Sequence, residues 1–331
     1  MNERTLSRRS MLGSAAALTS VALVPTLAKA QAVIRWGTVL APTHPEAIMM
    51  ERIAKEVREK TSGAVDIQVF PGGQLGSPRD MVEATASGAL TMVCDGAAQI
   101  GQFAPQLTII ESPYVWRDPR HMKTVLNSPV MDELNKALVD RRGLRMIGSM
   151  YYGRRHLTTG FRPVRTVEDM RGFKLRIPEL DVFRAMVEAW GARPTPLNFN
   201  ELYLALSQGA VDGQENPLPT IASGKLNEVQ KHLVLTGHII TPRVVTVNEK
   251  AWIALGEEHR RTVKGAIDAH AAWQDGEILS QEATLVDTFR KGGMVVIEPD
   301  LESFRKPVLA AVPARFESKW GKGAWERIQA L

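Results

Sequence analysis

Residues 172–216 have the sequence GFKLRIPELDVFRAMVEAWGARPTPLNFNELYLALSQGAVDGQEN. Near their start, apolar and charged side chains alternate from Lys174 to Ile177, which predicts a short, half-buried strand. Leu175 and Ile177 are expected to face the core, with Arg176 on the opposite face. An arginine fixed at a strand end offers a planar pair of donors that suits a carboxylate. Taken alone, however, such a residue is more often a solvated surface arginine.

Two helices are predicted after that strand. Apolar residues recur at helical spacing from Val182 to Trp190, and Gly191 is expected to end this helix. Asn200 is placed to cap the next helix, which should end at Gly209. Both apolar stripes are expected to pack into the core rather than to contact a ligand.

The first third of the chain alternates strands and helices. Strands are predicted over residues 33–39, 65–70 and 90–94. Each helix between them opens with a capping box and a proline in its first turn, at residues 43–46 and 77–80. This βαβαβ order predicts a parallel sheet with helices on both faces.

A very long helix is predicted near the end, over residues 257–290, with Gly276 as its one interruption. A helix of that length exceeds the ordinary globular range and is typical of one that bridges two bodies. About 300 residues are also more than one core usually holds. The predicted fold class is therefore α/β, with two domains.

Residues 1–30 have the features of an export signal. Ser7–Leu12 contains a twin-arginine pattern, which predicts the twin-arginine translocase as the partner during export. The apolar run at 12–27 is too short and too weakly hydrophobic for a stable membrane span. Ala28–Ala30 has the small-x-small form of a cleavage site, so the mature chain is expected to start at Gln31; an uncleaved anchor is the alternative.

Charge and cysteine content exclude several classes of function. The formal charge of the whole chain is +5, and the signal carries +3 of it, which leaves +2 on the mature protein. A net charge this close to zero, without a run of Lys and Arg residues, does not favour nucleic-acid binding. Cys94 is the single cysteine, so no intrachain disulfide is possible, and a small core residue is favoured over a reactive thiol.

Catalytic and metal-binding patterns are absent from the sequence. It contains no G-x-S-x-G, Walker loop, G-x-G-x-x-G or C-x-x-C. His232 and His238 lack metal-ligand spacing with a nearby acid. Gly72–Gly76 superficially suggests a phosphate loop but lacks the Lys-Ser/Thr end, so a strand-to-helix turn is the better interpretation. No catalytic residue, metal or cofactor is therefore predicted.

Several polar residues suit recognition of a small ligand. Arg155 is expected to turn into a cleft from an extended segment, and the proline after Asn216 biases that residue toward an extended backbone that holds its amide in a fixed direction. Phe199 could provide an apolar wall. Asp95 and Glu215 could accept hydrogen bonds from ligand hydroxyls, with structural roles at least as common for such residues.

Blocks of sequence along the mature chain resemble the substrate-binding proteins of the tripartite ATP-independent periplasmic (TRAP) transporters, of the C4-dicarboxylate-binding and sialic-acid-binding type. The blocks are QLG at 74–76, YYGRRHLTT at 151–159, GFKLRIP at 172–178, WGARPTPLNFNELY at 190–203, ALSQGAVDGQENP at 205–217 and VQKHL at 229–233. The resemblance covers nearly the whole mature chain. Three of these blocks, at 172–178, 190–203 and 205–217, make it a strong signal because they are specific and stand in the right order.

The resemblance implies a periplasmic-binding-protein fold with two α/β lobes, discontinuous domains, a cleft between them and a long bridging helix. Lobe I is then expected to comprise residues 31–153 plus about 242–281, and lobe II residues 154–241 plus about 282–331.

It also implies roles for single residues. The arginine that matches Arg176 grips the carboxylate, Arg155 supports it, and Phe199 and Asn216 line the cleft. Val39 stands where sialic-acid-binding members have an asparagine, and Ser77–Pro78 replaces their acid, which argues against sialic acid.

On lobe I, Val39, Gln74 and Asp95 are expected at the cleft. The adjacent Arg154 could meet a second carboxylate, although a solvent-facing neighbour of Arg155 is the more ordinary role.

The predicted function is capture of a small organic acid in the periplasm and its delivery to TRAP transporter membrane subunits, by a mature protein expected to be monomeric. The ligand stays open among dicarboxylates, sugar acids, and keto or hydroxy acids. A periplasmic enzyme or a ligand-sensing partner of a receptor, on the same two-lobed scaffold, is the alternative.

Overall fold

A computed structural model describes residues 31–331 of the chain. The predicted signal, with its twin arginines and cleavage site, lies outside these described residues. Residues 31–331 group into one unit by their contacts. Within this range, no helix is both long enough and apolar enough to cross a bilayer.

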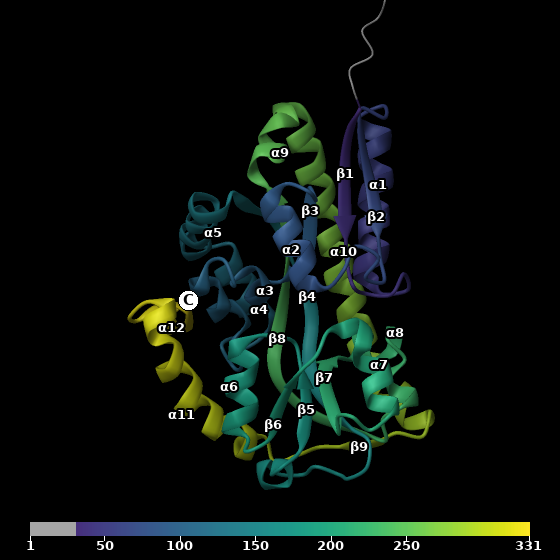
Figure 1. The fold of residues 1–331 in the computed structure, drawn as a ribbon, viewed down its shortest axis with the longest axis vertical. Coiled ribbons are helices and arrows are strands. Elements are labelled where there is room, and N and C mark those ends of the chain that lie inside the picture. Colours follow the sequence, from purple (N-terminus) through teal and green to yellow (C-terminus); the bar gives the residue numbers. More distant parts are fainter. Residues whose placement is uncertain (1–30) are drawn as a thin grey trace, which may run out of the picture. The chain divides into compact units, whose positions relative to one another are not determined.

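The strands of the described residues belong to one nine-stranded sheet (Figure 1). They are β1 (Ala32–Gly37), β2 (Val65–Phe70), β3 (Met92–Gly96), β4 (Leu144–Thr159), β5 (Lys174–Ile177), β6 (Arg193–Pro196), β7 (Gly213–Pro217), β8 (His232–Asn248) and β9 (Val295–Ile297).

Helices cover the sheet. The α-helices are α1 (Pro45–Lys60), α2 (Pro78–Ser87), α3 (Ala97–Ile100), α4 (Pro119–Leu126), α5 (Pro129–Arg142), α6 (Asp181–Ala189), α7 (Phe199–Ser207), α8 (Leu218–Ser223), α9 (Glu249–Ala254), α10 (Gly256–Lys291), α11 (Leu301–Trp320) and α12 (Ala324–Gln329). Short 3-10 turns are η1 (Pro105–Glu111), η2 (Val167–Met170) and η3 (Leu226–Glu228).

Two long antiparallel strands, β4 and β8, join two parallel groups within the sheet. The strand order is β2-β1-β3-β8-β4-β7-β5-β6, with β9 paired to β8. β1 pairs in parallel with β2 and β3, and β5 does so with β6 and β7. Figure 1 shows β4 and β8 running between these groups. The predicted α/β class and the parallel order of β1 to β3 are confirmed.

Helix starts agree with the sequence at α2 and differ at α1 and α7. Ser77 and Asp80 form the predicted capping box of α2. At α1 the cap is His44 instead of the residue before it, and its Nδ1 accepts from the backbone N–H of Glu46 at 3.0 Å. The predicted box fails because the Glu46 carboxylate points inward to other partners. α7 begins after Asn198, two residues earlier than predicted.

The ends of α6 and α7 follow the glycine signals. Gly191 and Gly209 adopt φ of +71° and +68°, which a side chain with a Cβ resists. The stripe on α6 is buried as predicted. Strand β5 differs in one respect: Arg176 is only 3% exposed, so both faces of this strand are buried. Cys94 is fully buried in β3, and burial raises the pKa of its thiol.

α10 spans 36 residues, as the long helical pattern predicted. Its first half packs with α1 through Val263 and Ile267, whereas Phe289 near its other end packs with residues around α8 and β9. The proposed lobe boundaries near residues 153, 241 and 281 fall inside β4, β8 and α10. The division into two lobes stays a prediction.

Candidate ligand-binding site

A cavity of about 70 Å³ lies where β3, β5, β7 and the middle of β4 and β8 converge. Its polar lining residues are Asp95, Gln99, Glu111, Tyr152, Arg155, Arg176, Asn216, Thr241 and Arg243. Its apolar walls include Val39, Leu40, Phe183 and Phe199. Three arginines thus surround one small space, and they differ in how their charges are compensated.

Arg176 is the arginine without an acidic partner. Strand β5 carries it into the cavity, where its Nε and Nη2 both donate to the backbone carbonyl of Leu197, at 2.9 and 2.7 Å. Within residues 31–331 it forms no ion pair, and the Phe199 ring lies 6.0 Å from its guanidinium carbon. Burial lowers the pKa of Arg176 to about 10. A buried cation held only by a carbonyl is suited to an anionic ligand.

Arg155 is fixed by Glu215 and Asn216. β4 and β7 pair so that Arg155 lies opposite Pro217. The Arg155 guanidinium donates to both Glu215 carboxylate oxygens, to the Glu215 backbone carbonyl at 2.7 Å and to Asn216 Oδ1 at 2.9 Å. Glu215 also contacts His238 Nε2 at 3.1 Å. Burial alone would raise the pKa of Glu215, but the charge of Arg155 lowers it overall.

Arg243, on β8, is paired with two carboxylates. Its Nε donates to Glu46 Oε2 at 2.7 Å, its Nη1 donates to Asp95 Oδ1, and its Nη2 lies 3.4 Å from Glu46 Oε1. The guanidinium also stacks over Tyr152, with its carbon 4.6 Å from the ring centroid. Although burial alone would lower the pKa of Arg243, the charges of Glu46 and Asp95 raise it overall. Its charge is therefore compensated within the protein.

On the side of the cavity formed by β3 and β8, two buried polar atoms lack hydrogen-bond partners. Asp95 Oδ2 and Thr241 Oγ1 are buried and form no hydrogen bond to any described residue. Glu111 accepts from the Ala98 N–H at 2.8 Å, and burial raises its pKa to about 7. Unsatisfied buried polar atoms on residues that line a cavity are candidates for hydrogen bonds to a ligand.

The structure brings six of the eight predicted site residues to the cavity lining: Val39, Asp95, Arg155, Arg176, Phe199 and Asn216. Glu215 lies behind Arg155, fully buried, and is placed to position that arginine. Gln74 is exposed and does not line the cavity. Arg154 also stays outside, because alternation along β4 sends it toward a separate cavity beside His156.

Sequence reasoning missed Arg243, Tyr152, Glu111 and Thr241. One signal was available, because Arg243 interrupts an otherwise apolar and threonine-rich strand, and a charge there requires a buried partner. Glu111 lies in a 3-10 turn with no periodic pattern, so its burial could not be read from its neighbours.

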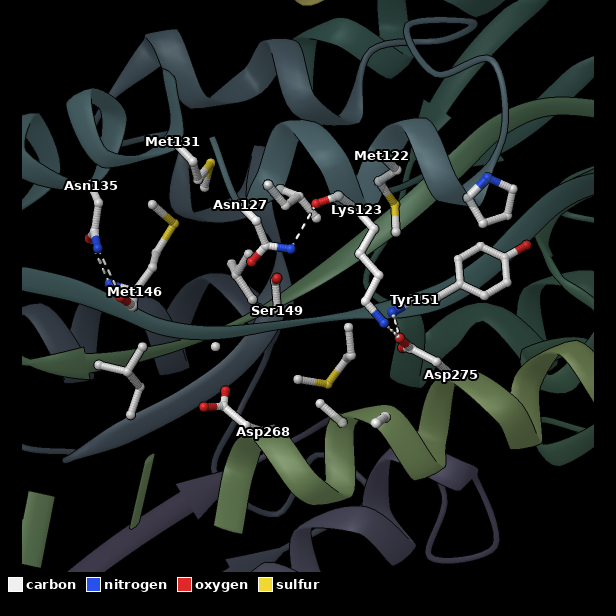
Figure 2. Close-up of a pocket in the computed structure, with 18 of the residues that line it drawn as sticks. Met122, Lys123, Asn127, Met131, Asn135, Met146, Ser149, Tyr151, Asp268 and Asp275 are labelled. Carbon is white, nitrogen blue, oxygen red and sulfur yellow. Dashed lines mark hydrogen bonds and ion pairs between the residues drawn. The ribbon is translucent and has the colours of Figure 1, made fainter. Parts of the chain in front are cut away.

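A larger groove of about 550 Å³ lies between α4, α5, β4 and α10 (Figure 2). It is rich in methionine, and both of its lysines face aspartates: Lys123 pairs with Asp275 at 2.8 Å, and Lys264 pairs with Asp268. Figure 2 shows the Lys123–Asp275 contact at the wall of the groove. Because both ammonium groups are already matched and the remaining cation of the lining, Arg120, is exposed to solvent, the groove is a poorer site for an anion than the smaller cavity. Among residues 31–331, no three potential metal-ligating side chains gather to form a site.

Comparison with known proteins shows which proteins this chain resembles. Residues 36–319 match the family model described as bacterial extracellular solute-binding protein, family 7. The sialic acid-binding periplasmic protein SiaP of Vibrio cholerae is 32% identical over 279 residues, which cover 84% of this chain and 86% of that protein.

Solved structures agree in fold over almost the same length. A TRAP periplasmic solute-binding protein from Polaromonas sp. JS666, bound to D-erythronate, has 32% identity and a TM-score of 0.86, covering 91% of this chain and 99% of that one. One from Sulfurospirillum deleyianum, with bound succinate, has 27% identity and a TM-score of 0.84, covering 90% and 98%. The family model, over residues 36–319, spans every strand that contributes to the cavity.

Proposed function

Since the chain belongs to family 7 of the bacterial extracellular solute-binding proteins, TRAP-type proteins that capture small carboxylates for delivery to a membrane transporter, we propose that it binds its ligand's carboxylate through Arg176. Arg155 supports the same group, and Asn216 fixes the direction of Arg155. A carboxylate would give Arg176 the charged, forked partner that it lacks.

One observation carries this assignment. Of the three cavity arginines, Arg155 and Arg243 already have carboxylate partners, whereas Arg176 has only the Leu197 carbonyl. A buried guanidinium without a carboxylate partner is stabilised most by an anion that binds it directly, with no water between the two. The unequal pairing therefore supports Arg176 as the primary anchor.

We also propose that two lobes close around the ligand. The polar groups of the cavity come from both proposed lobes: Asp95 and Arg243 lie in lobe I, and Arg176 and Asn216 lie in lobe II. Closure would exclude water, which strengthens the charged hydrogen bonds. The ligand then favours the closed form because it contacts both sides.

Export and processing belong to the same proposal. The twin arginines Arg8 and Arg9 support export through the twin-arginine route, followed by cleavage after Ala30 and release of a monomer into the periplasm. The function is transport without catalysis, in keeping with a family of solute-binding proteins. Periplasmic yield after Arg8→Lys and Arg9→Lys tests the export step, and an unchanged yield would exclude that route.

The central experiment compares Arg176→Lys with Arg154→Lys. Lysine keeps the charge but loses the fork, so Arg176→Lys is expected to weaken binding more than tenfold, or about 1.4 kcal/mol. Arg154→Lys, on the opposite side of β4, should bind as the parent protein does. Titration calorimetry would use the acid that gives the largest thermal shift in a panel including D-erythronate and succinate. Equal affinities for the parent and Arg176→Lys would place the carboxylate site elsewhere.

A further inference from the structure

We propose that this cavity selects hydroxylated monocarboxylates and discriminates against dicarboxylates. This inference rests on the proposed function, because it takes the carboxylate to lie on Arg176. It concerns the other end of the ligand, which faces Asp95, Glu111, Thr241 and Arg243.

The far end of the cavity offers no free positive charge. Arg243 is the arginine there, and each of its three nitrogens already contacts a carboxylate of Glu46 or Asp95. The N–H groups of Arg243 that these bonds leave could donate to a ligand oxygen, but a second ligand carboxylate would be the third carboxylate around a single guanidinium. Its negative charge would be buried without a counterion of its own, which is strongly unfavourable.

The far end of the cavity instead offers hydrogen-bond acceptors for the hydroxyl groups of a ligand. The Asp95 side chain lines the cavity, and its buried Oδ2 has no donor among the described residues. Its other oxygen, Oδ1, accepts from Arg243 and from the Gly96 N–H at 2.6 Å. A ligand hydroxyl can therefore donate to Oδ2 without disturbing any existing bond.

Thr241 provides a second polar group of the same kind. Thr241 lines the cavity, and its buried Oγ1 lacks a partner within residues 31–331. A hydroxyl group can either donate to a ligand or accept from it, so it suits a ligand hydroxyl in either orientation. A carboxylate could only accept here, and it would lie near the negative charge of Asp95.

Two kinds of ligand are disfavoured for different reasons. A dicarboxylate brings a negative charge against Asp95 in a site that excludes water. An unsubstituted fatty acid leaves Asp95 Oδ2 and Thr241 Oγ1 unsatisfied when the cavity closes. A ligand with one carboxylate and several hydroxyls meets both conditions, and the small volume favours a short chain.

Two series of acids, each at constant chain length, test the selectivity. The four-carbon series is D-erythronate, succinate and butyrate, and the six-carbon series is D-gluconate, adipate and hexanoate. We expect the hydroxylated monocarboxylate to bind at least tenfold more tightly than both others in at least one series. A dicarboxylate that binds as well as the hydroxylated acid in both series would overturn the inference, as would no binding by either hydroxylated acid at millimolar concentration.

Variants connect that selectivity to named atoms. Asp95→Asn removes the negative charge and releases Arg243 from one carboxylate, so the preference for the hydroxylated acid over the dicarboxylate should fall at least tenfold. Asp268→Asn, an exposed aspartate of the larger groove, is the matched control and should leave the ratio unchanged. An equal loss of affinity for every acid in Asp95→Asn would contradict the charge argument.

A second variant guards against misfolding of Asp95→Asn. Thr241→Val removes one hydroxyl with little change in shape or charge, and it should weaken the hydroxylated acid severalfold while leaving the dicarboxylate unaffected. Unchanged binding of the hydroxylated acid would exclude Thr241 as a ligand partner.

Failure of the two proposals can be told apart. If a dicarboxylate binds best but still depends on Arg176, the selectivity is wrong and the carboxylate anchor stands. If every acid is insensitive to Arg176→Lys, the anchor itself is wrong.

Discussion

The three cavity arginines differ in their ion-pair partners, and this difference, rather than the number of arginines, determines the electrostatic properties of the cavity. Arg155, Arg176 and Arg243 are all nearly buried, with exposures of 5%, 3% and 6%. Their partners decide their roles: Glu215 fixes Arg155, and Glu46 with Asp95 compensates Arg243. The chain could therefore change its ligand by replacing a partner acid while it keeps the arginine.

Glu111 makes the stability of the protein without ligand depend on pH. Its folded-state pKa of about 7 is raised above the ordinary 4.5, chiefly by burial. Below 4.5 the group is protonated in both states, and between 4.5 and 7 ionisation favours the unfolded chain. The stabilising effect of the neutral form is thus lost as pH rises through 7, in total by roughly 3 kcal/mol.

Removing the Glu111 carboxyl group should therefore increase the stability of the folded protein most at high pH. We expect the stability advantage of Glu111→Gln over the parent chain to be greater at pH 8 than at pH 5 by roughly 2–3 kcal/mol in urea unfolding. Contributions of the neighbouring Asp95, Arg155 and Arg243 are common to both chains. The exposed Glu83→Gln serves as control, and the same advantage at both pH values would show that Glu111 ionises normally.

Much of the site at this scale was visible in the sequence. Arg176, Arg155 and Asn216 could be found because they stand in specific blocks beside a strand end and a proline. Glu46 and Thr241 could not, and Arg243 offered only the signal of a charge within an apolar strand. These residues meet through pairing of β3 with β8 and through packing of α1, contacts between residues far apart in the chain. Gln74 shows the converse: it belongs to a specific block, yet its side chain is exposed.

At the scale of elements, the conformation of β4 places the anchor groups. Register shifts interrupt its pairing with β8 near Gly153 and again after Arg155. Gly153 has φ of +129°, and a Cβ there would lie 2.6 Å from Pro217 Cβ on β7. The strand can approach β7 this closely only because the side chain is missing, and this approach sets the position of Arg155.

Gly153→Ala is therefore expected to affect both stability and binding. Gly143→Ala is the matched control, because Gly143 also has positive φ (+62°) but has open space around it. The control should lose about 1–2 kcal/mol from backbone strain alone. Gly153→Ala should lose about 1–3 kcal/mol more, through overpacking and through a φ that lies outside the left-handed α region, and its ligand affinity should fall. Denaturant unfolding and calorimetry would check this, and equal losses in the two variants would exclude the steric contact.

Periodic elements were predictable, and their exact starts were less so. The 36 residues of α10 and the stripe of α6 follow from local pattern. The start of α7 was displaced because the chain leaves β6 by way of Leu197, whose carbonyl holds Arg176. Such tertiary contacts override a local capping preference.

For the whole molecule, the proposed closure makes a prediction in solution. Ligand should reduce the radius of gyration measured by X-ray scattering, because it contacts groups of both proposed lobes. The bound acid should also be recovered chemically unchanged after long incubation, as expected for a transport protein. Tight binding with an unaltered scattering curve would contradict the hinge, and a new product would favour an enzyme.

Three elements, β4, β8 and α10, pass through both proposed lobes, and this limits how the protein can be divided into fragments. Neither proposed lobe is a continuous stretch of chain, and each shares a strand of the same sheet with the other. No cut at one peptide bond therefore yields a self-contained half with its own complete sheet. We expect heating to melt residues 31–331 in a single cooperative step, and we expect new specificities to arise by replacing side chains around the cavity instead of by exchanging one half for another.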